Sequence, residues 1–597
     1  MTATPELGFD PTALREKYRS ERDRRLRSDG NAQYREIKGE FAHYLDDPYV
    51  APIKRAPLND DVDVVVVGGG FGGLLAGARL RQAGVERVRI VEKGGDFGGT
   101  WYWNRYPGAA CDIESYIYLP LIEEVGKMPS EKYARASEIL EHSRAIGRKF
   151  DLYKDACFQT EITEMRWDEK SARWIVKTNR GDEMRARFVC LASGPLHRPK
   201  LPGIPGVETF QGHSFHTSRW DYGYTGGDSN GNLTGLKGKR VGIIGTGATA
   251  VQCVPHLGAA AEQLYVFQRT PSSIDVRANH ATDPAWEASL SPGWQKRRMD
   301  NFNILLTGGY QSEDLVNDGW TEIIRNLILG EGAKKYSAQG QLSVEQLVEF
   351  ADFEKMEQIR ARVAAVVRDP VTAEALKPFY RQFCKRPCFH DEYLETFNRS
   401  NVHLVDTKGA GVDRITASGV VANGVEYPLD CLIYATGFEV GTGYSRRSGF
   451  EIYGRNGQSL SEKWSKGIRT FQGFHVEGFP NCFVVSNMQS GFTANFPHML
   501  AEQAQHVAYI VKHCTDQQVR MIEASPEAEA EWVETIRKLA ILRRKFLEEC
   551  TPGYYNNEGR PQDRSEQDGF YGAGPVAFVK VLEDWRAEGG LQGLVKA

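Results

Sequence analysis

Two segments of the chain show the same order of apolar, glycine-rich and helix-forming residues. The first reads VDVVVVGGGFGG from residue 62, and the second reads KRVGIIGTGATA from residue 239. A short apolar run bounded by glycines is typical of a buried strand in a parallel sheet, and a helix is expected after the turn. The pattern therefore predicts two strand–turn–helix units, and the sequence contains no third unit of this kind.

The remaining segments alternate between helical and extended patterns. The charged stretch ALREKYRSERDRRLRSD follows Asp10-Pro11, which predicts a helix with a capping aspartate that packs as an arm on the main body. From about 285 to 370 the pattern is helical, and we interpret this segment as an insertion that covers a site. Extended patterns return in NVHLVDT, CLIYATGF and CFVVSN, before a helical stretch at 497–513.

These elements predict an α/β protein with two Rossmann-like dinucleotide-binding domains and a helical insertion in the second one. The expected organisation is a helical arm at 1–60, the first part of the first domain at 61–200, the second domain at 201–395, the second part of the first domain at 396–545, and a C-terminal tail at 546–597.

The first unit carries the chemistry of a dinucleotide site. Gly68, Gly70 and Gly73 keep the GxGxxG register, which allows a tight turn, close approach of a pyrophosphate and packing of helix on strand. The phosphates would lie at the helix N-terminus, where free N–H groups favour anions. Glu92 ends the next strand, 24 residues after Gly68, where a carboxylate would hold ribose hydroxyls.

The second unit differs from the first at the diagnostic position. Gly245, Gly247 and Ala250 keep the related GxGxxA register, but the residue 24 positions after Gly245 is Arg269. A guanidinium there can bind a ribose 2′-phosphate, which a carboxylate would repel, so this unit should prefer NADPH over NADH. A single glycine set could mark an ordinary strand–turn–helix. Two glycine sets, with the oppositely charged Glu92 and Arg269 at the same offset, instead predict FAD in the first site and NADPH in the second.

Composition and charge restrict the partners. The chain has 597 residues, of which 41% are hydrophobic, and a formal charge of −4 with dispersed basic residues. Nothing indicates a nucleic-acid or anionic membrane surface, so the expected partners are small molecules. The N-terminus lacks the basic start and apolar core of a signal peptide, and no apolar stretch is long enough to span a bilayer, which predicts a cytoplasmic protein.

The ten cysteines contain no CxxC and no paired Cys/His spacing. This distribution is typical of reduced thiols in a cytosol, and it indicates neither a zinc site nor a disulfide framework. We therefore expect no metal ion.

Two longer motifs make the prediction specific. GGTWYWNRYPGAACD, at residues 98–112, and FQGHSFHTSRWD, at residues 210–221, resemble the long and short fingerprints of type I Baeyer–Villiger monooxygenases, which are class B flavoprotein monooxygenases. The matching positions are Gly98, Gly99, Trp101, Tyr106, Pro107, Gly108 and Asp112 in the first motif, and Phe210, Gly212, His216, Trp220 and Asp221 in the second.

The resemblance implies a reaction and a set of residues. Family members use FAD, NADPH and O2 to insert one oxygen atom next to a ketone carbonyl, through a flavin peroxide and a tetrahedral intermediate, and form an ester or lactone. By this resemblance, Arg386 in FCKRP is the catalytic arginine and Asp112 pairs with it. Lys385 is expected to join Arg269 and Thr270 at the 2′-phosphate. Further cofactor contacts are expected from Gly99, Thr100, Trp101, Asp112, Tyr118 and Thr249.

The resemblance also narrows the substrate. The chain length, the N-terminal arm and the segments CKRP and CTPGYYN are similar to the longer members that act on macrocyclic, steroid or polycyclic terpenoid ketones, including those that make antibiotic lactones. Met488, Phe492 and Phe496 could line the substrate pocket or simply pack in the core. We expect a bulky cyclic ketone as substrate and a monomer or weak homo-oligomer.

Two other flavoprotein classes share the nucleotide motifs. A flavin-containing monooxygenase that oxidises nitrogen or sulfur is the nearer alternative, and Asp112 with Arg386 argues against it. An NADPH–disulfide reductase needs a redox-active cysteine pair beside the flavin. Only Cys384 and Cys388 are close in sequence, with CxxxC spacing.

Overall fold

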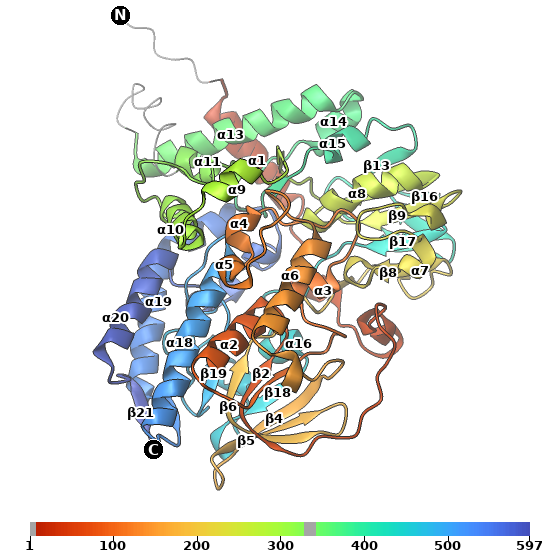
Figure 1. Ribbon diagram of the computed structural model, residues 1–597. Helices are drawn as coiled ribbons and strands as arrows, with labels where there is room; N and C mark the ends of the chain where they lie inside the picture. The colour runs from red at the N-terminus through yellow and green to blue at the C-terminus, as the bar shows by residue number, and fades with distance from the viewer. Residues whose placement is uncertain (1–7, 328–341) are drawn as a thin grey trace, which may run out of the picture.

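The first glycine-rich turn belongs to a seven-stranded sheet in the computed structural model, which describes residues 8–327 and 342–597 (Figure 1). Strands β2, β3, β6 and β19 pair in parallel, whereas β4, β5 and β6 form an antiparallel meander. The strands are β18 (Glu451–Tyr453), β4 (Ile162–Asp168), β5 (Arg173–Thr178), β6 (Glu183–Leu191), β2 (Asp61–Val67), β3 (Val88–Val91) and β19 (Cys482–Val484).

Helices cover the parallel part of this sheet. The turn after β2 leads into α2 (Phe71–Gln82), which packs against α18 (Phe496–Asp516) and α6 (Ala136–Lys149). Val64, Val65 and Val66 of β2 are fully buried, as the continuous apolar run predicted. Across residues 8–327 and 342–597, no helix combines the length and the apolar composition needed to cross a bilayer.

The second glycine-rich turn belongs to a separate five-stranded sheet in which all neighbours are parallel. The turn connects β9 to α8 (Ala248–Ala260), and the sheet lies to the right of the first one in Figure 1. In order across the sheet, the strands are β13 (Val402–Asp406), β10 (Gln263–Gln268), β9 (Arg240–Ile244), β17 (Cys431–Tyr434) and β8 (His213–His216). The predicted α/β fold with two Rossmann-like units is confirmed.

One predicted boundary is wrong. Strands β13 and β17 pair in the second sheet, whereas residues from 396 onward were expected in the first domain. The chain therefore returns to the first unit only after Tyr434. Both strands are short and apolar, and such a pattern predicts a strand without identifying the sheet it joins.

The predicted insertion is helical and caps the molecule beside both sheets (Figure 1). Its prediction at about 285–370 is confirmed except for residues 328–341, which lie outside the described ranges. The insertion contains α9 (Pro284–Ser289), α10 (Trp294–Leu306), α11 (Gly319–Leu327), α13 (Val344–Val366) and α14 (Pro370–Leu376).

The N-terminal arm begins with helix α1 (Pro11–Asp23). As predicted, Asp10 caps it, and its carboxylate accepts the backbone N–H groups of Thr12 and Ala13 at 2.8 and 3.1 Å. The helix is not wholly solvated, because Leu14 and Tyr18 are buried. Tyr18 packs edge-to-face on Phe353 of α13, with ring centroids 5.4 Å apart, so the arm covers the insertion.

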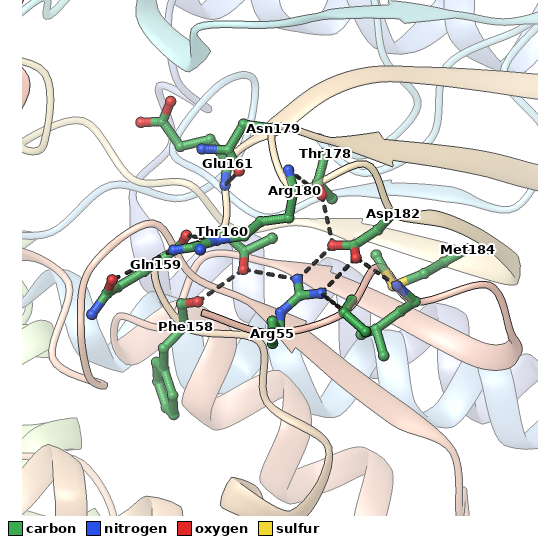
Figure 2. A network of polar contacts seen from close by, with 12 residues as sticks. Arg55, Phe158, Gln159, Thr160, Glu161, Thr178, Asn179, Arg180, Asp182 and Met184 are labelled. Atoms are coloured by element: carbon green, nitrogen blue, oxygen red, sulfur yellow. Dashed lines mark hydrogen bonds and ion pairs between the residues drawn. The ribbon is translucent and has the colours of Figure 1, made fainter. Parts of the chain in front are cut away.

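The coil at the end of the arm is attached to the first sheet through Arg55, as Figure 2 shows. The guanidinium donates to both carboxylate oxygens of Asp182, at 2.6 and 2.5 Å, and to the Thr160 hydroxyl at 3.2 Å. Asp182 lies between β5 and β6, has a fully buried side chain, and also accepts the Thr178 hydroxyl at 2.6 Å. This network holds the coil on the meander.

The C-terminal part folds along the outside of α18. It contains β20 (Ile522–Ala524), α19 (Pro526–Glu549), α20 (Pro575–Glu588) and β21 (Leu594–Lys596). Cys550, directly after α19, forms a disulfide with Cys384. The expectation that all ten cysteines are reduced thiols is therefore wrong. The partners are 166 residues apart, and sequence spacing carries no information about such a pairing.

Candidate active site

A cavity of about 1750 Å³ runs past both glycine-rich turns. Its walls come from both sheets, the coil of the N-terminal arm, the segment around Arg386, and the C-terminal tail after α19. A cavity of this size exceeds the usual range of about 300–1000 Å³ for a single small ligand. It has room for two nucleotides and a substrate.

The first turn can be built only from glycine at two of its positions. Gly68 has a φ of +102°, and a Cβ there would lie 2.6 Å from the carbonyl oxygen of Ala192. A Cβ at Gly73 would lie 1.8 Å from the carbonyl oxygen of Gly68. Gly70 is the N-cap of α2, so the free N–H groups of this helix face the cavity. The turn is thus shaped for a pyrophosphate.

Glu92 organises this turn. Its two carboxylate oxygens accept the backbone N–H groups of Gly69 and Gly94, both at 2.6 Å. Burial raises the pKa of Glu92, while these two backbone hydrogen bonds act in the opposite direction. Each oxygen keeps a second lone pair, and Glu92 lines the cavity, so it can also accept ribose hydroxyls.

The long fingerprint folds over the first turn. Gly99 has a φ of +52°, and a Cβ there would lie 2.5 Å from the Cα atom of Gly70. Helix α3 (Thr100–Trp103) follows, and the indole N–H of Trp101 donates to the Tyr118 hydroxyl at 3.1 Å. Several predicted cofactor residues of this region line the cavity, namely Gly99, Thr100, Trp101, Asp112 and Tyr118.

The second turn repeats the geometry of the first. Gly245 has a φ of +116°, and a Cβ there would lie 2.4 Å from the carbonyl oxygen of Ala435. Gly247 caps α8 with φ −78° and ψ −174°, close to the φ −78° and ψ −171° of Gly70. A Cβ at Gly247 would meet no atom within 4 Å. Thr249 also lines the cavity, and Ala250 is fully buried beneath the turn.

A group of polar side chains lies at the end of β10. Arg269 donates to Gln33 Oε1 at 2.5 Å and forms an ion pair with Glu558 at 3.4 Å. Lys385 Nζ donates to the carbonyl oxygen of Thr270 at 3.3 Å. Within the described part of the chain, the Thr270 hydroxyl is buried without a hydrogen-bond partner. A phosphate oxygen is a suitable acceptor for this hydroxyl.

Lys385 lacks a carboxylate partner among the described residues. Burial is the main cause that lowers the pKa of Lys385, to about 8. Cys388 acts in the opposite direction, and the nearby charges of Arg269 and Arg25 lower the pKa further. A cation with a depressed pKa beside a second cation favours a bound anion. This arrangement fits the 2′-phosphate of NADPH.

Arg386 and Asp112 form the ion pair that the resemblance implied, with Nη2 and Oδ1 2.7 Å apart. Trp320 of α11 holds both residues, because its indole N–H donates to the Asp112 carbonyl at 2.8 Å and its ring lies 4.9 Å from the Arg386 guanidinium. Burial lowers the pKa of Arg386, but Asp112, Tyr555 and Tyr554 raise it more, so the net shift is upward. The guanidinium stays charged and faces the cavity.

Aromatic side chains contribute to the lining of the cavity. Tyr554 and Tyr555 lie in the C-terminal tail with ring centroids 4.5 Å apart, and Tyr554 is 42% exposed. Phe492 stacks on Phe570 at 4.9 Å. Met488 and Phe496 also line the cavity. Trp320 and Phe570 were not among the predicted residues, because no local motif marks them, whereas Tyr554 and Tyr555 lie in the CTPGYYN segment that the family resemblance singled out.

The short fingerprint lies elsewhere. His216 and Trp220 are fully buried, and neither belongs to the described lining of the cavity. His216 Nδ1 contacts the Ser218 hydroxyl at 2.9 Å, and burial lowers the pKa of His216 to about 3. The Trp220 indole donates to the Thr225 hydroxyl at 3.1 Å. These residues hold the passage from the first unit into the second.

Comparisons with known proteins identify relatives over nearly the whole chain. A family model described as pyridine nucleotide-disulphide oxidoreductase matches residues 65–303. Neopentalenolactone D synthase of Streptomyces avermitilis is 58% identical over 582 residues, which cover 97% of this chain and 98% of that protein. A Baeyer–Villiger monooxygenase of Stachybotrys chlorohalonatus is 51% identical, and the match covers 99% of this chain and 95% of that protein.

Solved structures agree with these relatives. The polycyclic ketone monooxygenase of Thermothelomyces thermophila has a TM-score of 0.90 and 39% identity, and the match covers 98% of this chain and 99% of that one. The enzyme OTEMO, solved in complex with FAD and NADP, has a TM-score of 0.74 and 29% identity over 91% of this chain and 100% of that one.

Proposed function

The chain belongs to the Baeyer–Villiger monooxygenases, an enzyme family that uses FAD and NADPH to insert one atom of O2 next to a ketone carbonyl, and on this premise we propose that its substrate is a bulky, fused-ring ketone and its product a lactone. The relative that is 58% identical is named as a lactone synthase, and the structural neighbour with a TM-score of 0.90 is named for polycyclic ketones. The observation that carries the proposal is the cavity of about 1750 Å³, which is lined by Arg386 and several aromatic side chains in addition to the two glycine turns.

We propose that the first turn with Glu92 holds FAD and that the second turn with Arg269 and Lys385 holds NADPH. Bound FAD supplies acceptance of a hydride from NADPH and activation of O2. The protein residues supply position and charge. The glycine turns direct helix N-termini at the phosphates, and Glu92 orients a ribose.

Arg386 is proposed as the catalytic cation. Its guanidinium stays charged at any working pH, and Asp112 with Trp320 fixes its direction. A fixed positive charge beside the ketone stabilises negative charge that develops on the carbonyl oxygen, at little reorganisation cost. Tyr554 lies close enough to Arg386 to raise the pKa of the guanidinium, and its phenol adds an O–H group to the lining of the cavity there.

The fused-ring substrate is proposed from the aromatic side chains among the residues that line the cavity. Phe492, Phe496 and Phe570 belong to this lining, and the ring of Phe492 stacks on that of Phe570. Such surfaces bury apolar area, at about 25 cal/mol per Å², and select large rigid ring systems over small ketones.

The test is a substrate comparison with purified enzyme. Ketone-dependent NADPH oxidation is measured with cyclohexanone, a steroid ketone and a fused tricyclic terpenoid ketone, and products are checked by mass spectrometry for a gain of one oxygen atom. We expect kcat/KM to be at least about a hundredfold higher for the fused-ring ketones, which corresponds to about 2.7 kcal/mol of added binding. Equal or higher kcat/KM for cyclohexanone would contradict the proposed substrate class.

We also propose that the enzyme works in the cytoplasm as a monomer or weak homo-oligomer. The Cys384–Cys550 disulfide is compatible with a reducing compartment, because both cysteines are buried and thiol exchange requires access. Light scattering of the purified protein tests the oligomeric state, and fractionation of cells tests the cytoplasmic location.

A further inference from the structure

The N-terminal arm and the C-terminal tail meet beside the second nucleotide site. Asn31 donates to the Asn557 side chain at 2.6 Å, and the Tyr34 hydroxyl contacts Glu558 at 3.3 Å. Arg560 donates to the carbonyl oxygen of Ser28. These contacts join segments more than 500 residues apart into one wall of the cavity.

This wall holds Arg269 in place. Arg25 Nε donates to the carbonyl oxygen of Arg269 at 3.1 Å, so the arm fixes the backbone. Gln33 accepts from the Arg269 guanidinium at 2.5 Å, and Glu558 lies 3.4 Å from its other nitrogen. The residue at the diagnostic position for the 2′-phosphate is therefore oriented from outside the domain that carries it.

Arg27 adds a second guanidinium on this wall. It lines the same cavity as Arg269, its side chain is 43% exposed, and Arg269 acts on it electrostatically. Within the described residues, Asp29 binds its Nε and Nη2 groups at 2.9 and 2.6 Å, and no hydrogen bond from the Nη1 group to those residues is found. Two guanidinium groups that face one cavity repel each other, and a doubly charged phosphate between them removes this repulsion.

Glu558 opposes such an anion. Its side chain is only 4% exposed, and its carboxylate lies beside Arg269. A buried carboxylate at this distance neutralises part of the positive charge of Arg269 and repels a phosphate. On this wall, Arg27 should therefore strengthen binding of the 2′-phosphate, and Glu558 should weaken it.

We propose that the arm and the tail complete the NADPH site, with Arg27 as an additional ligand of the 2′-phosphate and Glu558 as the residue that limits the preference for NADPH over NADH. The inference rests on the proposed assignment of Arg269 to the 2′-phosphate. Under this proposal, the arm and the tail, which lie outside both nucleotide-binding units, take part in the selection of NADPH over NADH.

The test measures binding of NADP+ and NAD+ to the FAD-loaded enzyme by calorimetry, without turnover. Arg27→Ala is expected to raise the Kd for NADP+ about tenfold, equivalent to about 1.4 kcal/mol, and to leave the Kd for NAD+ within about twofold. Arg27→Lys should lose less affinity, because it keeps the charge. Glu558→Gln should lower the Kd for NADP+ about threefold and not that for NAD+.

Arg35→Ala is the matched control. Arg35 lies on the same arm, is paired with Glu208 and is 38% exposed, but it is not among the described residues that line the cavity. If Arg27→Ala binds NADP+ as tightly as Arg35→Ala while Arg269→Ala weakens it, the inference is wrong and the assignment of Arg269 stands. If Arg269→Ala has no effect either, both are wrong. FAD content and melting temperature identify any variant that fails to fold.

Discussion

At the scale of residues, the site depends on pairs that combine distant parts of the sequence. Arg386 and Asp112 are 274 positions apart and form an ion pair at 2.7 Å. The resemblance to the family pointed to both residues, but the Trp320 contact that fixes the pair came only from the structure. A motif reports the residues that chemistry requires, whereas the side chains that orient them are set by packing.

The role of Arg386 leads to a prediction about two separate steps. Arg386→Ala should lower ester formation by at least about a hundredfold, because it removes the cation that stabilises charge on the ketone oxygen. Reduction of bound FAD by NADPH should change by less than about threefold, because this step does not involve the ketone. Stopped-flow absorbance and product mass spectrometry measure the two steps. Near-normal lactone yield from the variant would contradict the assignment.

Lys385 predicts a dependence of NADP+ binding on pH. Its pKa of about 8 in the free protein means that it loses its charge as the pH rises through 8. Bound phosphate favours the protonated amine, so the Kd for NADP+ should be constant near pH 7 and rise by up to about tenfold by pH 9.5.

Lys385→Arg provides the control for this prediction. A guanidinium does not titrate in this range, so the variant should bind NADP+ with a Kd that changes little between pH 7 and 9.5. A rise of the Kd in the variant equal to that of the wild type would assign the titration to another group.

At the scale of elements, most helices and strands followed from the apolar pattern. The two strand–turn–helix units, the helical insertion and the capped arm helix lie where they were predicted. The error concerned β13 and β17, which join the second sheet rather than the first. The pattern of a short buried strand is the same in any parallel sheet, so the choice of sheet depends on contacts between distant segments.

The coil that leads from the arm to β2 depends on the network in Figure 2. Arg55→Ala should leave Asp182 buried without its main partner, which should lower the local free energy of opening of β5 and β6 by about 3 kcal/mol at pH 7. Hydrogen–deuterium exchange of these strands measures this change. Arg87→Ala removes an exposed pair with Asp63 and should cost less than about 1 kcal/mol.

The same network predicts a pH dependence. Burial raises the pKa of Asp182, but the bonds from Arg55 and Thr178 outweigh it and lower the pKa to about 2. A carboxyl with a depressed pKa stabilises the fold above its unfolded value of about 3.9, and this contribution is lost as the pH falls toward 2. In Arg55→Ala the pKa of Asp182 should rise, so Asp182 should become protonated, and the variant should unfold, at a higher pH than the wild type. Identical acid-unfolding curves would contradict this account.

At the scale of the whole molecule, distant parts of the chain meet around Arg386. Asp112 of the first unit, Arg386 of the segment after the insertion and Tyr554 of the tail line the cavity, and Trp320 of the insertion packs on the Arg386 guanidinium. The Cys384–Cys550 disulfide joins the tail to the segment that carries Arg386. The tail therefore lines the same cavity as Arg386, although its residues were expected to form a segment separate from the two nucleotide-binding units.

Removing this link should loosen the tail. Cys550→Ser is expected to lower the free energy of unfolding by about 2–4 kcal/mol and to raise KM for a fused-ring ketone more than KM for NADPH. Peptide mapping without reductant should recover the Cys384–Cys550 crosslink from the wild type. A reductant should lower the melting temperature of the wild type but not that of the variant, and equal sensitivity of both proteins would contradict the structural role of the disulfide.

The sequence alone sufficed for the α/β class, the two nucleotide turns with Glu92 and Arg269, and the family. These features are local, because a glycine turn, an apolar strand and a charge at a fixed offset are encoded within about 30 residues. The tertiary structure decided which sheet β13 and β17 join, which cysteines pair, and which residues surround Arg269 and Arg386. The Cys384–Cys550 and Arg269–Glu558 contacts, for example, join residues 166 and 289 positions apart, and the free energy of such contacts comes from packing and burial that no local pattern records.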